Sequence, residues 1–158
     1  MIEFIERISD LNILESSRVY VYDIGDLIIK KYDYNPLKEI KIHNDLDKTG
    51  LIPKLITSFK HDYCYYLVVE KIECLDASVR ASMKHKFDLC DYHDEIEKIE
   101  DEYQDEIEDY EEELAMFNYS IDDIHIGNFG YKEKQLICLD EGCFNSMDMK
   151  DFEDEMLR

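Results

Sequence analysis

The first part of the chain combines a β-hairpin pattern with a helix. Residues 19–32 hold two runs of aromatic and β-branched residues, and the Gly-Asp pair at 25–26 separates them as a tight turn would. The Asn-Pro pair at 35–36 is a favourable helix start, because asparagine caps a helix and proline fits its first turn. We expect this helix to run to about Lys48 and to stop at Gly50.

Two further strands are expected after this helix. Residues 51–57 and 63–69 are apolar and rich in β-formers, and the polar residues 58–62 between them predict a short turn. The first 70 residues therefore predict the order strand, strand, helix, strand, strand. No repeat and no low-complexity linker interrupts this order.

The second half opens with a predicted loop or short helix at 74–90 and continues with one long amphipathic helix at 91–117. Apolar residues recur in that helix at spacings of three and four, which places them in one stripe. A buried strand is predicted at 135–139, between two polar loops. The stripe consists of Ile96, Ile99, Tyr103, Ile107, Tyr110, Leu114 and Phe117.

Charge is distributed very unevenly in this protein. The chain has 39 acidic residues against 18 basic ones, which gives a formal net charge of −21. Between Asp91 and Leu114 there are 14 acids and one lysine. Repulsion on this scale argues against direct binding of nucleic acid or of an anionic membrane. The acidic face of the helix 91–117 could bind a basic host protein or imitate nucleic acid. The alternative interpretation is that it is an ordinary solvated face.

The cysteines and the first residues bear on the compartment. Five cysteines, an odd number without a CxxC pair, are typical of reduced thiols rather than of a zinc site or a disulfide framework. The first 14 residues carry acids where a signal peptide has a basic flank and an apolar run. No stretch approaches the ~20 apolar residues that a membrane span needs. We therefore expect a soluble, cytoplasmic protein without a membrane partner.

Three oxygen-bearing side chains lie around one predicted hairpin: Asp123, Asn128 and Asp140. A hairpin of this length brings the residues at its two ends together. Carboxylate and amide oxygens are the hard ligands that Mg²⁺ prefers. Magnesium is needed when phosphate charge must be neutralised during transfer, so the pattern indicates phosphate chemistry.

These residues also carry a family resemblance. Residues 123–128, DIHIGN, are similar to the catalytic loop D-[LI]-x-x-x-N of the protein-kinase-like superfamily. The form D-x-H-x-G-N resembles the aminoglycoside-phosphotransferase branch and the small kinase-like proteins of phages. Twelve residues after Asn128, LDEG resembles the family's DFG motif, with Glu141 in place of phenylalanine.

The first half resembles the same family. LIIK, at residues 27–30, is similar to the VAIK strand, whose lysine holds the α- and β-phosphates of ATP, and this role falls to Lys30. Glu39, in the following helix, would be its ion-pair partner. The segment YLVVEKIE, at 66–73, resembles the strand that leads into the hinge. The backbone groups of Glu70, Lys71 and Ile72 would then contact adenine, and Val69 would be the gatekeeper.

The resemblance implies an α+β fold, a minimal two-lobed protein-kinase-like domain over residues 1–158. A small antiparallel sheet with one helix would form the lobe 1–72, and a reduced, mainly helical lobe would form 73–158. The nucleotide would lie between them.

The function that the resemblance implies is an ATP- and Mg²⁺-dependent phosphotransferase acting on a hydroxyl acceptor. Lys30 would hold phosphates, Asp123 would orient or deprotonate the acceptor, and Asn128 and Asp140 would hold magnesium. His125 would support the conformation of the loop rather than act as a base.

Two alternatives to these assignments stay open within the motifs. Lys31 follows Lys30 on the opposite face of the strand, so an error of one residue in register would exchange them. Asp122 lies beside Asp123, but only Asp123 stands five residues before Asn128.

Two departures from the family pattern leave the function open. The glycine-rich loop should fall near residues 9–18, which contain no glycine, and only 18 residues follow Asp140. A full activation segment does not fit in that length. One alternative is therefore a catalytically weak pseudokinase that binds and regulates a partner. The other is an acidic nucleic-acid mimic that inhibits a basic protein, as a phage protein would.

Overall fold

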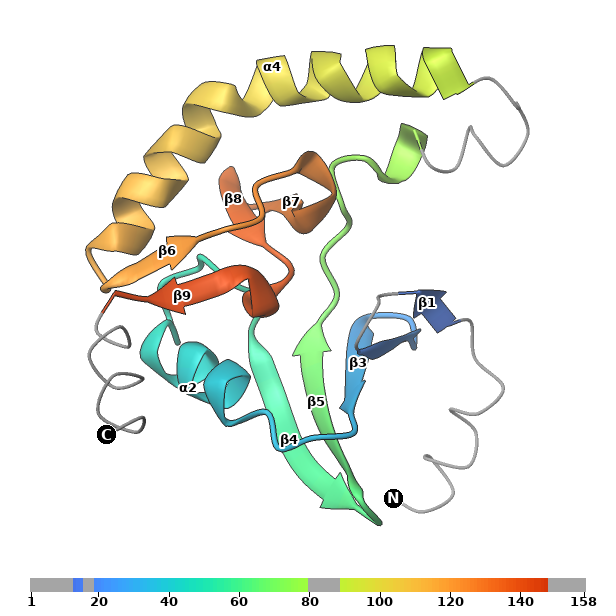
Figure 1. The fold of residues 1–158 in the computed structure, drawn as a ribbon, viewed down its shortest axis with the longest axis vertical. Coiled ribbons are helices and arrows are strands. Elements are labelled where there is room, and N and C mark those ends of the chain that lie inside the picture. Colours follow the sequence, from blue (N-terminus) through green and yellow to red (C-terminus); the bar gives the residue numbers. More distant parts are fainter. Residues whose placement is uncertain (1–12, 16–18, 80–88, 148–158) are drawn as a thin grey trace, which may run out of the picture. The chain divides into compact units, whose positions relative to one another are not determined.

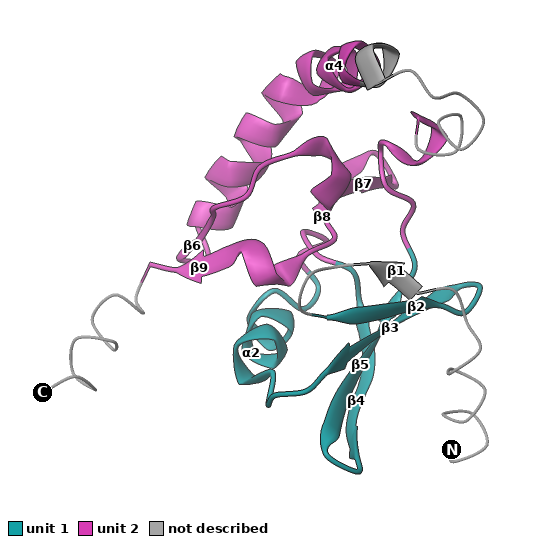
Figure 2. Ribbon diagram, turned by 45° about the vertical axis from the view of Figure 1, so that its right-hand side comes forward, with its two compact units in different colours: residues 1–48, 53–71 teal, residues 49–52, 72–158 magenta. Residues whose placement is uncertain are grey.

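The computed structural model describes residues 13–15, 19–79 and 89–147 of the 158-residue chain. They divide into two compact units, which Figure 2 shows in different colours. Unit 1 comprises Met1–Lys48 and Pro53–Lys71, and unit 2 comprises Thr49–Ile52 and Ile72–Arg158. The sequence placed the lobe boundary after residue 72, and it did not assign residues 49–52 to the second lobe.

Unit 1 is built on a five-stranded antiparallel sheet with the strand order β1-β2-β3-β5-β4 (Figures 1 and 2). The hairpin predicted around Gly25 joins β2 to β3. Gly25 has a φ of +93°, which glycine adopts without strain, and its amide donates to Asp23 Oδ1 at 3.1 Å. The strands are β1 (Ile13–Glu15), β2 (Tyr20–Asp23), β3 (Leu27–Tyr32), β4 (Leu55–His61) and β5 (Cys64–Glu70).

The predicted turn at 58–62 is wrong, because most of those residues belong to β4. Two cross-strand contacts extend the strand: Phe59 stacks on Tyr66 at 5.1 Å between ring centroids, and Lys60 Nζ lies 5.1 Å from the Tyr65 ring. The chain instead turns immediately after His61, where Asp62 has a φ of +53°.

The helix between β3 and β4, α2 (Leu37–Asp45), is shorter than the sequence predicts. Asn35 does not cap it with its side chain; Pro36 occupies the cap position, without a side-chain hydrogen bond. At the other end the amide of Leu46, whose side chain is almost fully buried, donates to Ile42 O and closes the last turn. Lys48 then takes a φ of +71°, so the helix ends before the expected residue.

In its described residues, unit 2 contains one long helix and two small sheets (Figure 1). A strand before the catalytic-loop segment pairs with a strand after the LDEG motif, and the hairpin between the two motifs forms the second sheet. Within the described residues, no helix is both long and apolar enough to cross a membrane. The elements are α4 (Leu89–Ala115), β6 (Tyr119–Ile121), η1 (Ile126–Asn128), β7 (Phe129–Lys132), β8 (Gln135–Cys138), η2 (Glu141–Cys143) and β9 (Phe144–Ser146).

The apolar stripe of α4 packs into the core of unit 2 over its last three turns. Ile107, Tyr110 and Leu114 are buried, and the Tyr110 ring meets Phe129 of β7 edge-on at 5.5 Å. The Tyr110 hydroxyl donates to the backbone carbonyl of Leu51 at 2.8 Å. The predicted helix extends two residues too far: it ends at Ala115, and Phe117, the last residue of the predicted stripe, is 39% exposed.

Candidate functional site

The register of β3 distinguishes the two neighbouring lysines. Lys30 pairs with Val21 and Leu67 and is 8% exposed. Lys31 points to the opposite face, where it pairs with Tyr66 and its Nζ lies 5.5 Å from the centroid of the Tyr20 ring. Lys30 is therefore the buried lysine of this strand. Its role towards phosphate stays a prediction.

Glu39 of α2 is buried, with 6% of its surface exposed. Its Oε1 accepts a hydrogen bond from the Tyr34 hydroxyl at 2.8 Å. Its Oε2 is buried without a hydrogen-bond partner among the described residues. A buried carboxylate oxygen in this state favours the approach of a cation, because desolvation without compensation costs free energy. The ion pair with Lys30 stays a prediction.

The end of β5 carries the predicted adenine-binding segment. Glu70 N donates to Lys54 O at 3.0 Å, and Lys71 N donates to Asp26 O at 3.0 Å. Successive amides therefore point to opposite sides, as in an extended strand. Lys71 Nζ bonds Asp23 Oδ2 at 2.7 Å, and this hydrogen bond lowers the pKa of the Asp23 carboxyl. The backbone amide and the side-chain ammonium of Lys71 thus both bond residues of the β2–β3 turn.

The segment after Lys71 runs along the β7–β8 hairpin within unit 2. Cys74 forms an antiparallel bridge with Gly130, and Leu75 N donates to Phe129 O at 2.9 Å. A Cβ on Gly130 would lie 2.6 Å from Ile72 Cγ2 and 2.7 Å from Glu73 O. Only glycine permits so close an approach. The bridge therefore fixes Ile72 against the hairpin that carries the catalytic-loop motif.

Asn128 stands at the start of this hairpin, and its amide is held in one orientation. Its Nδ2 donates to the backbone carbonyl of Asp123 at 3.0 Å and to Cys143 Sγ at 3.5 Å. Because a carbonyl oxygen only accepts, the nitrogen of the Asn128 amide must face Asp123. The Oδ1 atom therefore points away from these partners and stays available as a ligand.

Asp140 lies beside Asn128 because β7 and β8 pair in register, with Phe129 opposite Cys138. Leu139 N donates to Asn128 O at 2.7 Å, which joins the two strands next to both side chains. The exposed carboxylate of Asp140 accepts from Gly142 N at 3.0 Å through Oδ1. The hairpin thus brings Asn128 and Asp140 to the same end of the sheet.

The two neighbouring aspartates have different surroundings. Asp122 accepts a short hydrogen bond from Asn145 Nδ2, and its own amide donates to Cys143 O at 3.0 Å. Asp123 has a side chain 69% exposed, and its Oδ2 lies 3.9 Å from His125 Nε2. Asp122 thus has an amide side chain as partner, and the role of Asp123 towards a substrate stays a prediction.

His125 supports the loop through its ring. Its Nδ1 accepts a hydrogen bond from Gly127 N at 3.1 Å, at the start of η1. A neutral imidazole that accepts at Nδ1 carries its proton on Nε2, the atom nearest Asp123. These contacts agree with the loop-supporting role that the sequence indicated.

The donor set fits a hard cation only in part. Among the described residues, no group of three or more histidine, cysteine, aspartate or glutamate side chains is placed to hold a metal ion. Asn128 Oδ1 and the Asp140 carboxylate are nevertheless oxygen donors at one end of a hairpin. Magnesium is commonly held by one or two protein oxygens together with substrate phosphates and water. The pair therefore fits a magnesium ion that arrives with a nucleotide.

The candidate residues form two separate groups. Unit 1 carries Lys30, Glu39 and Glu70, and unit 2 carries Ile72 with the catalytic-loop residues. Sequence reasoning missed the supporting residues: Tyr34 on Glu39, and Cys143 on Asn128. No local pattern in the sequence predicts these two contacts, because they depend on how the chain folds back on itself. Gly130 did have a sequence signal, since a glycine within a strand indicates a close backbone approach.

Comparison with known proteins supports the fold and leaves the family open. No family model matches the sequence, and no curated protein matches it. Among solved structures, WbdD is similar, with a TM-score of 0.57 and 12% identity over 89% of this chain and 34% of WbdD. A co-crystal structure of WbdD with the kinase inhibitor LY294002 has a TM-score of 0.55 and 11% identity, over 93% of this chain and 35% of WbdD. The structure of monomeric WbdD has a TM-score of 0.53 and 12% identity, over 88% of this chain and 35% of WbdD.

These matches concern the fold alone, because the identities are 11–12% and the chain spans about a third of the length of WbdD. The predicted fold class is confirmed: the protein is α+β, with a small antiparallel sheet and few helices, and it is consistent with a minimal kinase-like fold.

Proposed function

We propose that this protein is an ATP- and Mg²⁺-dependent phosphotransferase that acts on a hydroxyl acceptor. The observation that carries the proposal is the fixed amide of Asn128 beside Asp140. An amide anchored through its nitrogen presents its oxygen without further rearrangement, which is what a metal ligand requires. The kinase-like fold and the order of the motifs support the same conclusion.

In this proposal Lys30 holds the phosphates, and Glu39 orients Lys30. Lys30 is buried in the sheet, and its ammonium would hold the α- and β-phosphates. Glu39 Oε2, buried and without a hydrogen-bond partner among the described residues, would orient the ammonium. The backbone groups of Glu70 and Ile72 would contact adenine.

The catalytic loop acts on the acceptor. Asp123 is exposed and would orient the acceptor hydroxyl or take its proton. His125, held by Gly127, would keep the loop in place. Asn128 and Asp140 would hold magnesium, which when bound neutralises phosphate charge and aligns the phosphates for transfer.

The experiment separates transfer from binding. Asp123→Asn should abolish phosphate transfer and leave nucleotide binding largely intact, because this carboxylate acts on the acceptor. Asp122→Asn is the matched control, and it should retain transfer because its partner is Asn145. Transfer is measured with radiolabelled ATP and a panel of hydroxyl-bearing acceptors. Equal losses in the two variants would reject the assignment.

A second candidate is a pseudokinase that binds a partner and transfers no phosphate. Two observations favour it: residues 9–18 contain no glycine, and the position of the family's phenylalanine holds a buried glutamate, Glu141. Of the segment 9–18, only residues 13–15 are described. Its partner would be a basic protein that contacts the acidic helix. Nucleotide binding without transfer to any acceptor would favour this candidate.

A further inference from the structure

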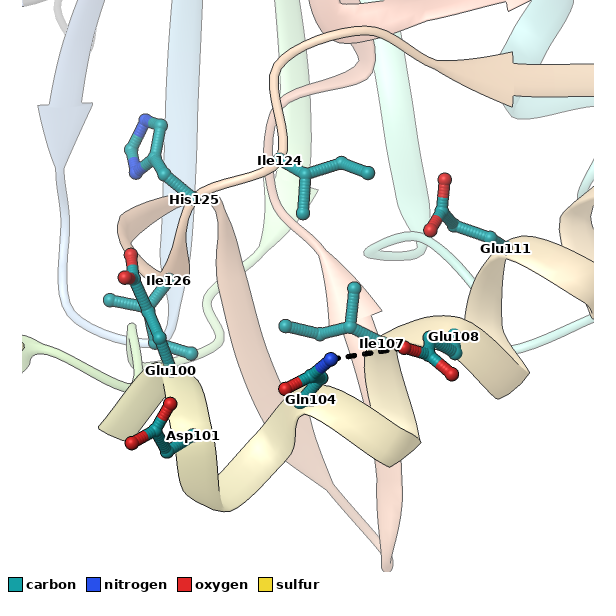
Figure 3. Close-up of a pocket in the computed structure, with 9 residues that line it drawn as sticks. All are labelled: Glu100, Asp101, Gln104, Ile107, Glu108, Glu111, Ile124, His125 and Ile126. Carbon is teal, nitrogen blue, oxygen red and sulfur yellow. Dashed lines mark hydrogen bonds between the residues drawn. The ribbon is translucent and has the colours of Figure 1, made fainter. Parts of the chain in front are cut away.

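A groove in unit 2 lies between α4 and the catalytic loop, and it has a volume of about 310 Å³ (Figure 3). Residues 124–126 of the loop form one wall, directly after Asp123. One face of α4 forms the other wall, with residues spaced by three and four positions. The α4 residues that line it are Glu100, Asp101, Gln104, Ile107, Glu108 and Glu111.

The floor of the groove is apolar. Ile107 of α4 and Ile124 of the loop point toward each other across it (Figure 3). Ile107 is 8% exposed and belongs to the core, but Ile124 is 42% exposed. The two isoleucines give the groove an apolar floor on which the aliphatic part of an amphipathic side chain can pack.

The α4 side of the groove is acidic. Four of its lining residues are carboxylates: Glu100 and Asp101 lie near one end, and Glu108 and Glu111 lie near the other (Figure 3). Gln104 Nε2 donates to Glu108 Oε1 at 3.2 Å, so this carboxylate keeps Oε2 for another donor. The lining holds no lysine or arginine.

The C-terminal end of α4 is not matched to the helix dipole. The last turn of α4 contains no basic residue, although cations are favoured at a helix C-terminus. Glu111, which lines the groove, stands just before that turn. The dipole therefore gives no local reason for an acid at this position.

We propose that this groove docks a basic segment of a partner protein. The aliphatic stem of a lysine or arginine would lie on Ile124, and its charged head would reach the carboxylates of α4. An apolar floor with acids along one wall matches this amphipathic side chain better than it matches a bare cation. Phosphate-bearing ligands are excluded from it by repulsion.

The proposal extends beyond phosphate transfer and does not depend on it. A docked segment would lie beside residues 124–126, next to the candidate catalytic residue Asp123. A partner that carries a hydroxyl could be an acceptor, and a partner without one could simply be held. Binding measured in the absence of nucleotide therefore tests the groove separately from the proposed function.

The test uses a labelled peptide of nine residues, in which lysine and leucine alternate around a central serine. Its binding to the full chain is followed by fluorescence anisotropy in 0.1 M salt. A second peptide carries acetyl-lysine at every lysine, which keeps the stem and removes the charge. Spermine serves as a third ligand, with charge and no apolar side chains. The first peptide should bind saturably, the acetylated one should not, and spermine should compete poorly.

Two variants locate the binding on α4. The groove variant carries Glu100→Gln, Glu108→Gln and Glu111→Gln. The matched control carries Glu102→Gln, Asp105→Asn and Glu112→Gln, which remove the same charge from exposed positions outside the groove. The groove variant should bind the peptide about tenfold more weakly, which corresponds to ~1.4 kcal/mol. The control should change binding by less than about threefold, because its carboxylates do not line the groove and are exposed to water, where charge pairs contribute little.

Ile124→Ser tests the floor, and it should weaken peptide binding several-fold at unchanged helix content by circular dichroism. Several results would overturn the proposal. They are the absence of saturable binding to the parent chain, equal losses in the groove and control variants, equal binding of the acetylated peptide, full competition by spermine, or unchanged binding by Ile124→Ser. Equal losses would indicate a diffuse acidic field, as in a nucleic-acid mimic.

Discussion

Gly130→Ala tests the contact that joins the predicted adenine-binding segment to the catalytic-loop hairpin. The new Cβ would lie 2.6 Å from Ile72 Cγ2, 2.7 Å from Glu73 O and 3.3 Å from Leu139 Cδ2. Nonbonded carbon atoms prefer separations of about 3.5–4.0 Å. Glu73 O belongs to the backbone, and Ile72 Cγ2 is attached to a branched Cβ. Glu73 O can move aside only if the chain shifts, and Ile72 Cγ2 can move only if the side chain leaves its rotamer.

The cost follows from two opposing effects. Overpacking of this kind costs about 1–3 kcal/mol. The smaller conformational freedom of alanine in the unfolded chain returns about 0.4–1 kcal/mol. The difference between these ranges spans about 0–2.6 kcal/mol, and because two of the new contacts would be shorter than 3.0 Å we expect a net loss of about 1–2 kcal/mol in the free energy of unfolding. Gly142→Ala is the control, because its Cβ would contact only the exposed Asp140 side chain, at 3.0 Å. It should change stability by less than about 0.5 kcal/mol.

The assay is urea unfolding followed by far-ultraviolet circular dichroism. The chain contains no tryptophan, and the signal of the long helix α4 reports on unit 2. With a slope of about 1–3 kcal/mol per molar urea, the midpoint of Gly130→Ala should fall by roughly 0.3–2 M. A variant as stable as the parent would refute the reasoning, since the bridge would then yield to an added methyl group at no cost.

Two further predictions concern hydrogen bonds within single units. Tyr110→Phe should destabilise unit 2 by about 0.5–1.5 kcal/mol in urea unfolding, because the Leu51 carbonyl loses one of its two donors and keeps Cys138 N. Burial raises the pKa of Tyr110, so the free energy of unfolding should fall as pH rises above about 10, less steeply in the variant. Lys71→Met should raise the pKa of Asp23 toward its ordinary value in an NMR titration, and it should lower the free energy of unfolding by less than about 1 kcal/mol. This ion pair stabilises the parent at neutral pH, and its contribution is lost as pH falls through the lowered pKa of Asp23; no difference in that pKa would contradict the assignment.

Local patterns predicted the parts of the fold that local chemistry decides. The hairpin at Gly25 depends on one left-handed glycine, and the long helix depends on the spacing of its apolar residues. The motif order placed Asn128 and Asp140 at the two ends of a hairpin, and the observed register brings them together. Asp123 was preferred over Asp122 by spacing alone, and its catalytic role stays a prediction; the structure shows that Asp122 has Asn145 as a side-chain partner.

Errors arose where distant residues decide the structure. The strand β4 extends to His61 because Phe59 stacks on Tyr66 across the sheet. Residues 49–52 belong to unit 2, since Cys138 N donates to Leu51 O at 3.0 Å and Tyr110 donates to the same carbonyl. Such contacts join residues far apart in the sequence, so periodicity and turn signals cannot reveal them.

Titration of Mg-ATP against the full chain tests the central claim most directly. Isothermal titration calorimetry should show saturable binding of ATP that requires Mg²⁺. Lys30→Ala and Asp140→Ala should each weaken it by about tenfold or more, because each removes a charge-assisted contact worth ~1.5–3 kcal/mol. Lys31→Ala, on the opposite face of β3, should bind as the parent does. No binding of ATP by the parent chain, with or without Mg²⁺, or equal binding by the Lys30, Asp140 and Lys31 variants, would contradict the account.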